Sequence, residues 1–186
     1  MPVCTSNIIN KKIEIIYLLE SSSFEMINNI QELKERLFTS GIVKDEQELQ
    51  GCTPEEIAYI ESKYGVLPRT YREILGLLGH RAGKLIRGSE FEFYFDQLIK
   101  MNEWKQEIIL ESIAEGEECT PLPKNAFCIC ALHGDPWFII ANGQDDCSVY
   151  FLHDDGITIK ESSKSVMDWI EGFVEQVEYL IRRELR

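Results

Sequence analysis

The chain has 186 residues, of which 44% are hydrophobic and 10% aromatic, enough to build the core of one domain and too much for a disordered chain. Its 32 acidic and 19 basic side chains give a net charge of −13. This balance argues against a protein that binds nucleic acid or an anionic membrane through a basic surface. It leaves open a small-molecule enzyme, a cation binder or a protein with a basic partner.

The sequence indicates a cytoplasmic protein. No stretch approaches the roughly 20 apolar residues that a membrane-spanning helix needs. The apolar run over residues 13–19 is short, and Glu14 interrupts it, so it does not resemble a signal peptide.

None of the six cysteines forms a C-x-x-C pair, which is the basic unit of a zinc ribbon or a thioredoxin-type site. We therefore expect no cofactor and assign no metal ligand.

Residues 1–50 are interpreted as an N-terminal extension that contains a strand or turn and then a helix. Ser22-x-x-Glu25 is a capping box, and apolar residues at positions 26 or 27, 30, 33 and 37 recur at helical spacing. Gly41 supplies a stop for this helix. The main domain is expected over residues 51–186.

Two well-marked helices open that domain. Thr53 is a good N-cap, Pro54 suits the first helical position, and Glu56 completes a capping box. Gly65 ends this helix. The second helix stops at Gly79 and carries one apolar side, formed by Tyr71, Ile74, Leu75 and Leu78.

A third helix is predicted over about residues 97–115, after a segment of strand character at 84–95. Asp96 is the expected N-cap. The expected apolar face of the helix consists of Leu98, Met101, Trp104, Ile108, Ile109 and Ser112.

Short strands and turns follow from residue 121. Strands at 127–132, 137–141, 148–152 and 157–159, joined by short turns, predict an antiparallel meander. Asn142-Gly143 is a strong hairpin signal. A long amphipathic helix closes the chain from about residue 166, and Ser165-x-x-Asp168 can cap it. The order of helices, meander and helix predicts an α+β fold, a mostly antiparallel sheet with flanking helices.

Candidate catalytic groups do not form a set. The histidines His80, His133 and His153 all fall in predicted turns. The segment 79–84 has the glycines and lysine of a phosphate-binding loop, but its spacing is one residue short and Leu85 stands where Ser or Thr must bind magnesium. No G-x-S-x-G nucleophile elbow occurs. We predict no catalytic residue and no enzyme activity; an enzyme that uses the turn His and Asp residues is the least favoured alternative.

Acidic side chains are concentrated in one part of the chain. Residues 101–178 hold 16 acidic side chains and four basic ones. Four of the glutamates repeat at i+4 on the third predicted helix, where like charges cost about 0.2–0.5 kcal/mol per pair. The final helix carries a second series, Asp168, Glu171, Glu175 and Glu178.

Two interpretations of this acidic region remain open: a solvated face and a docking surface for a basic partner. For the second interpretation we select the helix and turn residues, with an aromatic side chain beside them, as the candidate partner-binding set. These residues are Glu103, Glu107, Glu111, Glu115, Asp135, Trp137, Asp145, Asp146, Asp154 and Asp155.

The order and spacing of several motifs resemble the SUKH superfamily of Smi–Knr-like domains. The motifs that carry the resemblance are Thr53-Pro-Glu-Glu-Ile57, Gly65-Val-Leu-Pro68-Arg-Thr-Tyr71, Leu122-Pro123 with Phe127, Asn142-Gly143, and Ser165-Val-Met-Asp-Trp169-Ile170. The resemblance covers roughly residues 50–178. It implies a single non-enzymatic α+β domain and supplies no catalytic residues.

The resemblance also implies a function. Bacterial members look like cytoplasmic immunity proteins that bind a cognate polymorphic toxin, and fungal relatives look like regulators of cell-wall assembly. We therefore expect an immunity protein that neutralises a nuclease-type toxin and acts as a monomer or weak homodimer. It is expected to bind neither nucleic acid nor membrane. The alternative is a non-enzymatic scaffold or regulatory protein of the Smi–Knr type.

Overall fold

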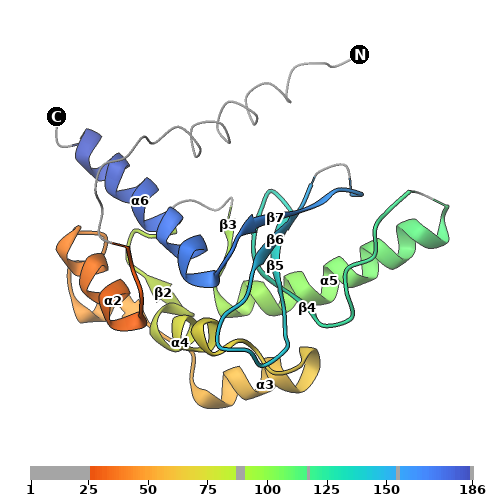
Figure 1. Ribbon diagram of the computed structural model, residues 1–186, viewed down its shortest axis with the longest axis horizontal. Helices are drawn as coiled ribbons and strands as arrows, with labels where there is room; N and C mark the ends of the chain where they lie inside the picture. The colour runs from red at the N-terminus through yellow and green to blue at the C-terminus, as the bar shows by residue number, and fades with distance from the viewer. Residues whose placement is uncertain (1–25, 87–90, 117, 154–155, 185–186) are drawn as a thin grey trace.

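The computed structural model describes residues 26–86, 91–116, 118–153 and 156–184, and it shows the α+β fold that the sequence predicts (Figure 1). The helices are α2 (Ile30–Thr39), α3 (Pro54–Tyr64), α4 (Arg69–Leu78), α5 (Phe95–Ala114) and α6 (Val166–Glu184), with a short 3₁₀ helix η1 (Glu46–Glu48). The strands are β1 (Leu49–Gln50), β2 (Arg81–Ala82), β3 (Phe91–Glu92), β4 (Ala126–Leu132), β5 (Asp135–Ile140), β6 (Val149–Leu152) and β7 (Ile159–Ser163). The predicted segment at 13–19 lies outside the described residues.

The predicted antiparallel meander is present as β4, β5, β6 and β7, and β3 pairs with β4 at its edge. The strands β1 and β2 form a separate antiparallel pair. The turn between β4 and β5 holds two residues, His133 with φ 53° and Gly134 with φ 89°. Positive φ at both central positions is the signature of a type I′ hairpin, whose twist matches that of the strands. The strand β4 is buried at positions 126–131, as expected for a central strand.

The Asn142-Gly143 turn does not form the short hairpin that the sequence predicts. The strand β5 ends at Ile140 and β6 begins at Val149, so a longer loop joins them. The backbone of this loop bonds to the connection between α3 and α4: the Gly143 N–H donates to the Val66 carbonyl at 2.9 Å.

The same loop caps helix α4. Pro68, the N-cap residue of α4, offers no side-chain hydrogen bond. Instead, the N–H groups of Arg69 and Thr70 donate to the carbonyls of Gln144 and Asp145, each at 2.9 Å. These bonds satisfy donors that the first turn of a helix leaves unpaired.

Helix α2 begins later than the sequence predicts. Ser22 and Glu25, the predicted capping box, lie outside the described residues, and residues 26–29 are not helical. The Asn29 side chain caps the helix by accepting from the N–H groups of Gln31 and Glu32, each at 3.0 Å. Over the described residues 26–29 the predicted helix is therefore wrong, because the Asn29 side chain caps a helix that starts at Ile30.

The two helices at the start of the predicted main domain are confirmed. Thr53 Oγ1 accepts from the Glu56 N–H at 3.2 Å, and the Glu56 carboxylate accepts from the Thr53 N–H at 2.8 Å. Gly65 ends α3 with φ 103°. The four predicted apolar residues of α4 are all buried.

Three expectations around helix α5 are corrected. Of the residues that the structure describes within 84–95, only Phe91–Glu92 form a strand. The N-cap is Tyr94 rather than Asp96, and the Gln97 side chain accepts from the Tyr94 N–H at 3.2 Å. Trp104 is 51% exposed, whereas Leu98, Met101 and Ile109 of the predicted apolar face are buried, so the buried side of the helix does not include position 104.

The described part of the first fifty residues shares one core with the rest of the chain. Leu33, Leu37 and Ile42 are fully buried in the same cluster as Phe127 and Phe138 of the sheet. The domain boundary at residue 50 stays a prediction, but no break in packing accompanies it.

Helix α6 starts as predicted and packs against the sheet through aromatic rings. Ser165 Oγ accepts from the Asp168 N–H at 2.9 Å. The Phe173 ring lies 5.8 Å from that of Phe91 and 6.5 Å from that of Trp137. Across the described residues, every helix is too short or too polar to serve as a membrane span.

Candidate functional site

The four predicted glutamates of helix α5 are all exposed, but they are not equivalent. The Glu103 carboxylate lies 2.6 Å from Nζ of Lys63, and this hydrogen bond raises the pKa of Lys63. Glu107, Glu111 and Glu115 follow on the C-terminal half and at the C-cap. No basic residue lies in the last turn of this helix. Acidic groups there face the negative end of the helix dipole, so folding does not explain them.

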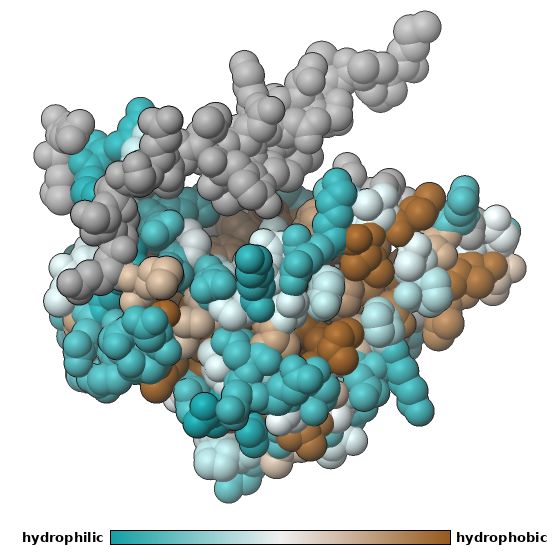
Figure 2. Space-filling model, viewed as in Figure 1, coloured by the Kyte–Doolittle hydropathy of each residue, from teal (hydrophilic) through white to brown (hydrophobic). Residues whose placement is uncertain are grey.

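Large apolar side chains are also exposed on this helix. Leu110 is 65% and Ile113 is 39% exposed, in addition to Trp104. Figure 1 shows α5 reaching beyond the sheet, and Figure 2 shows apolar patches among hydrophilic residues over that end of the molecule. Exposed apolar groups beside charges are typical of binding surfaces. We call Trp104, Glu107, Leu110, Glu111, Ile113 and Glu115 the α5 surface.

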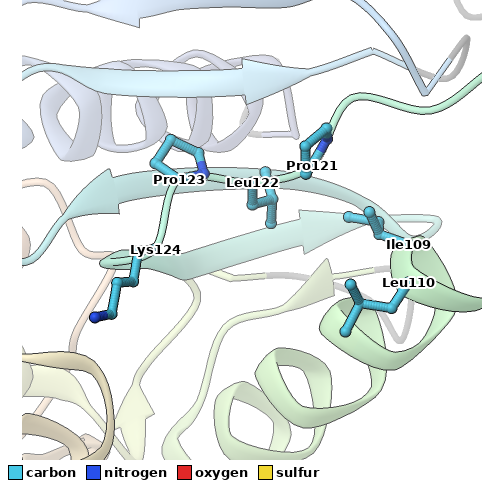
Figure 3. Close-up of a pocket in the computed structure, with 6 residues that line it drawn as sticks. All are labelled: Ile109, Leu110, Pro121, Leu122, Pro123 and Lys124. Atoms are coloured by element: carbon cyan, nitrogen blue, oxygen red, sulfur yellow. The ribbon is translucent and has the colours of Figure 1, made fainter. Parts of the chain in front are cut away.

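A pocket of about 240 Å³ adjoins the α5 surface. Figure 3 shows it between Ile109 and Leu110 of the helix and the segment 121–124 that precedes β4. Pro121, Leu122 and Pro123 supply apolar walls, and Lys124 supplies a cation at the edge. The pocket could receive an apolar side chain of a partner.

The second acidic series, on helix α6, does not form a free acidic face. Nε of Arg36 lies 3.0 Å from the Glu178 carboxylate, and Nη1 lies 2.7 Å from that of Glu171. The side chains of these three residues are only 10–13% exposed. Burial would lower the pKa of Arg36, but the bonds to Glu178 and Glu171 outweigh it and raise the pKa. Part of the negative charge is therefore neutralised inside the fold.

The candidate aspartates of the turns do not belong to the α5 surface, and the described ones have other positions or partners. Asp146 accepts from the N–H of Val166 at 2.9 Å and so caps helix α6. Asp145 lies 3.2 Å from Nε of Arg69 in an exposed ion pair. Asp135 begins β5 opposite Leu132. Asp154 and Asp155 lie outside the described residues.

Trp137 belongs to the aromatic packing of the sheet. It is half-buried, and its Nε1–H donates to Ser162 Oγ at 3.2 Å. Its ring centroid lies 4.7 Å from that of Phe151. The structure therefore gives Trp137 a packing role.

Leu110 and Ile113 were not among the predicted site residues. The available signal was their position off the apolar stripe of the predicted helix.

A second candidate group of side chains, which the sequence did not predict, comes together beside α3. Cys52, Glu56 and His80 bring one sulfur, one carboxylate oxygen and one ring nitrogen within 4.8 Å of one another. His80 Nε2 lies 2.9 Å from the Glu56 carboxylate. The bond from His80, followed by that from Thr53, lowers the pKa of Glu56. We call Cys52, Glu56 and His80 the thiol cluster.

The thiol cluster does not favour nucleophilic catalysis. Burial, then the charges of Glu56 and Asp96, raise the pKa of the Cys52 thiol to about 12. A nucleophilic cysteine needs a lowered pKa, since the thiolate is the reactive form. The other histidines, His133 and His153, lie in turns of the meander.

Comparison with known proteins finds one family. The model of the SMI1 / KNR4 family (SUKH-1) matches residues 51–172, which is more than half of the chain. No curated protein matches, and no solved structure matches. The matched range starts just before α3 and ends within α6.

Proposed function

The chain belongs to the SMI1 / KNR4 family (SUKH-1), and from this premise we propose that it is an immunity protein. It binds a cognate toxin domain of nuclease type in the cytoplasm and neutralises it by forming a stoichiometric complex. The exposed acidic and apolar end of helix α5 is the observation that supports this proposal.

Charge complementarity selects the partner. A nuclease holds its substrate in a groove that is basic, because the groove must bind phosphates. Glu107, Glu111 and Glu115 present carboxylates along one exposed half-helix. Their charges would speed the encounter with such a groove, and they would slow association with acidic proteins.

Apolar anchors would supply most of the affinity. A few buried apolar or aromatic side chains dominate the energy of typical interfaces. The apolar side chains of Leu110 and Ile113 are exposed to solvent. The adjoining pocket offers a recess for a partner side chain. The α5 surface therefore combines both ingredients of a specific interface.

Co-expression and titration test the proposal. The full chain is expressed with the toxin domain encoded by the neighbouring gene, and cell survival is measured with and without it. Calorimetry of the purified proteins should show a tight complex with one chain per toxin domain. Absence of heat together with absence of protection would overturn the proposal. A complex with a cellular regulator, without protection from any toxin, would instead identify a scaffold.

A further inference from the structure

The thiol cluster lies at the opposite end of α5 from the α5 surface. The His80 ring is 5.5 Å from that of Phe95, the first residue of α5, whereas Leu110 lies fifteen positions later. At about 1.5 Å per residue these positions are over 20 Å apart along the helix. The cluster is therefore separate from the proposed toxin contact.

We propose that Cys52, Glu56 and His80 bind a divalent metal ion of the zinc class. Sulfur, imidazole nitrogen and carboxylate oxygen are the three ligand types that zinc takes from proteins. In tetrahedral zinc sites neighbouring ligand atoms lie roughly 3–4 Å apart, a spacing that follows from bonds of about 2.0–2.3 Å. The three atoms here lie within 4.8 Å of one another, so small side-chain movements complete the set.

The exposure of the cluster suits a site with three protein ligands. Cys52 is buried, whereas the side chains of His80 and Glu56 are 23% and 29% exposed. An ion there would have access to solvent on one side, and water would complete its coordination. Charge also favours a cation, because Glu56 and Asp96 both act electrostatically on the Cys52 sulfur.

Backbone hydrogen bonds hold two of the three ligands, Cys52 and His80, in place before any ion binds. The Cys52 N–H donates to the Leu75 carbonyl and the His80 N–H donates to the Gln50 carbonyl, each at 2.8 Å. A Cβ at position 79 would overlap the Cys52 sulfur, so glycine permits the close approach. These contacts hold the residues just before α3 against the C-terminal end of α4.

The capping role of Glu56 can be separated from metal binding by substitution. A capping box works with Gln as well as Glu at this position. Replacement of Glu56 by Gln should therefore keep the cap of α3 while it removes the anionic ligand. This difference separates a structural role from metal binding.

Cobalt(II) titration of the full chain tests the site. Co²⁺ replaces Zn²⁺ in tetrahedral sites and gives a thiolate-to-cobalt absorption band when a cysteine binds it. The wild-type chain should bind one Co²⁺ with this band, and one equivalent of Zn²⁺ should remove the band. Cys52→Ser should abolish the band, and both His80→Ala and Glu56→Gln should weaken Co²⁺ binding at least tenfold. The matched controls, Cys147→Ser and His133→Ala, should bind as the wild type does.

Two results would overturn the proposal. One is a wild-type chain that shows no thiolate-to-cobalt band under reducing conditions at neutral pH. The other is a band that survives in Cys52→Ser, which would assign the ion to another cysteine. Circular dichroism and urea unfolding without metal establish that each variant is folded, so a lost band reports lost coordination.

Discussion

Arg36 of α2 and Glu178 of α6 form a two-point contact between helices that lie 142 positions apart in the chain. Nε of Arg36 donates to one carboxylate oxygen at 3.0 Å, and Nη2 donates to the other at 3.2 Å. Both side chains are nearly buried, at 13% and 10% exposure. The pair joins a helix outside the matched family range to the final helix.

Replacement of Arg36 by Ala should destabilise the fold strongly. It leaves the buried carboxylate of Glu171 without its cation and leaves Glu178 only the half-exposed Arg182 at 3.8 Å. Breaking such a buried pair costs about 3–5 kcal/mol. Urea unfolding monitored by tryptophan fluorescence measures the loss. Arg69→Ala is the matched control, since its ion pair with Asp145 is 61% and 85% exposed and should contribute at most about 1 kcal/mol. Equal losses in the two variants would contradict the structural difference.

Glu175 should give the stability a pH dependence of a defined sign. Burial, then the charge of Glu171, raises its pKa above 4.5. A carboxyl with a raised folded-state pKa binds more protons when folded, so its ionisation lowers stability as pH rises through that folded pKa. Glu175→Gln should therefore raise the urea midpoint at pH 7, and the gain should vanish below pH 4.5. Glu73→Gln, on the exposed side of α4, controls for lost surface charge; a destabilised Glu175→Gln at pH 7 would refute the assignment.

Asn102 should be essential for the irregular part of strand β4. It is 2% exposed, its Nδ2 donates to the carbonyls of Leu98 and Cys128, and its Oδ1 accepts from the Cys128 N–H at 2.8 Å. The strand register shifts between Cys128 and Cys130, and the Asn102 side chain bonds both backbone groups of Cys128 at this irregularity. Asn102→Ala should lower the free energy of unfolding by about 3 kcal/mol in urea unfolding, because it removes the hydrogen bonds of buried backbone polar groups. Ser112→Ala, on the same helix, should be nearly neutral.

Leu110 should anchor the toxin. Under the proposed function, Leu110→Ala should weaken the complex at least tenfold in calorimetry, while the free energy of unfolding changes little because the side chain is 65% exposed. Leu180→Ala is the matched control on α6, with 39% exposure. Equal affinities for Leu110→Ala and the wild type would move the interface away from α5.

Glu111 should act on the rate of association. Glu111→Lys reverses a charge on the proposed docking surface, so binding to a basic partner should slow severalfold at low ionic strength and less at high salt. Stopped-flow mixing measures this rate. Glu73→Lys makes the same charge change on another exposed helix position. If both variants slow association equally, net charge rather than the α5 surface governs the encounter.

Local sequence determined where several elements begin and which fold class they build. The capping box of Thr53 and Glu56 and the cap from Ser165 to Asp168 were predictable, because each bond joins residues three positions apart. The buried strand over 127–132 was predictable from its continuous apolar run. The exposure of Trp104, in the middle of α5, was harder to predict, because this residue follows the same periodicity as the buried residues of the helix.

The tertiary structure decided which charges are free and which side chains meet. Glu178 and Glu107 look alike in the sequence, yet Arg36 neutralises one in a buried pair while the other stays exposed. Likewise, the sequence predicts only that His80 lies in a turn, and the tertiary structure shows that its ring contacts the Glu56 carboxylate. Hydrogen bonds within one turn depend on neighbouring residues alone, whereas burial and long-range pairing depend on how all elements pack.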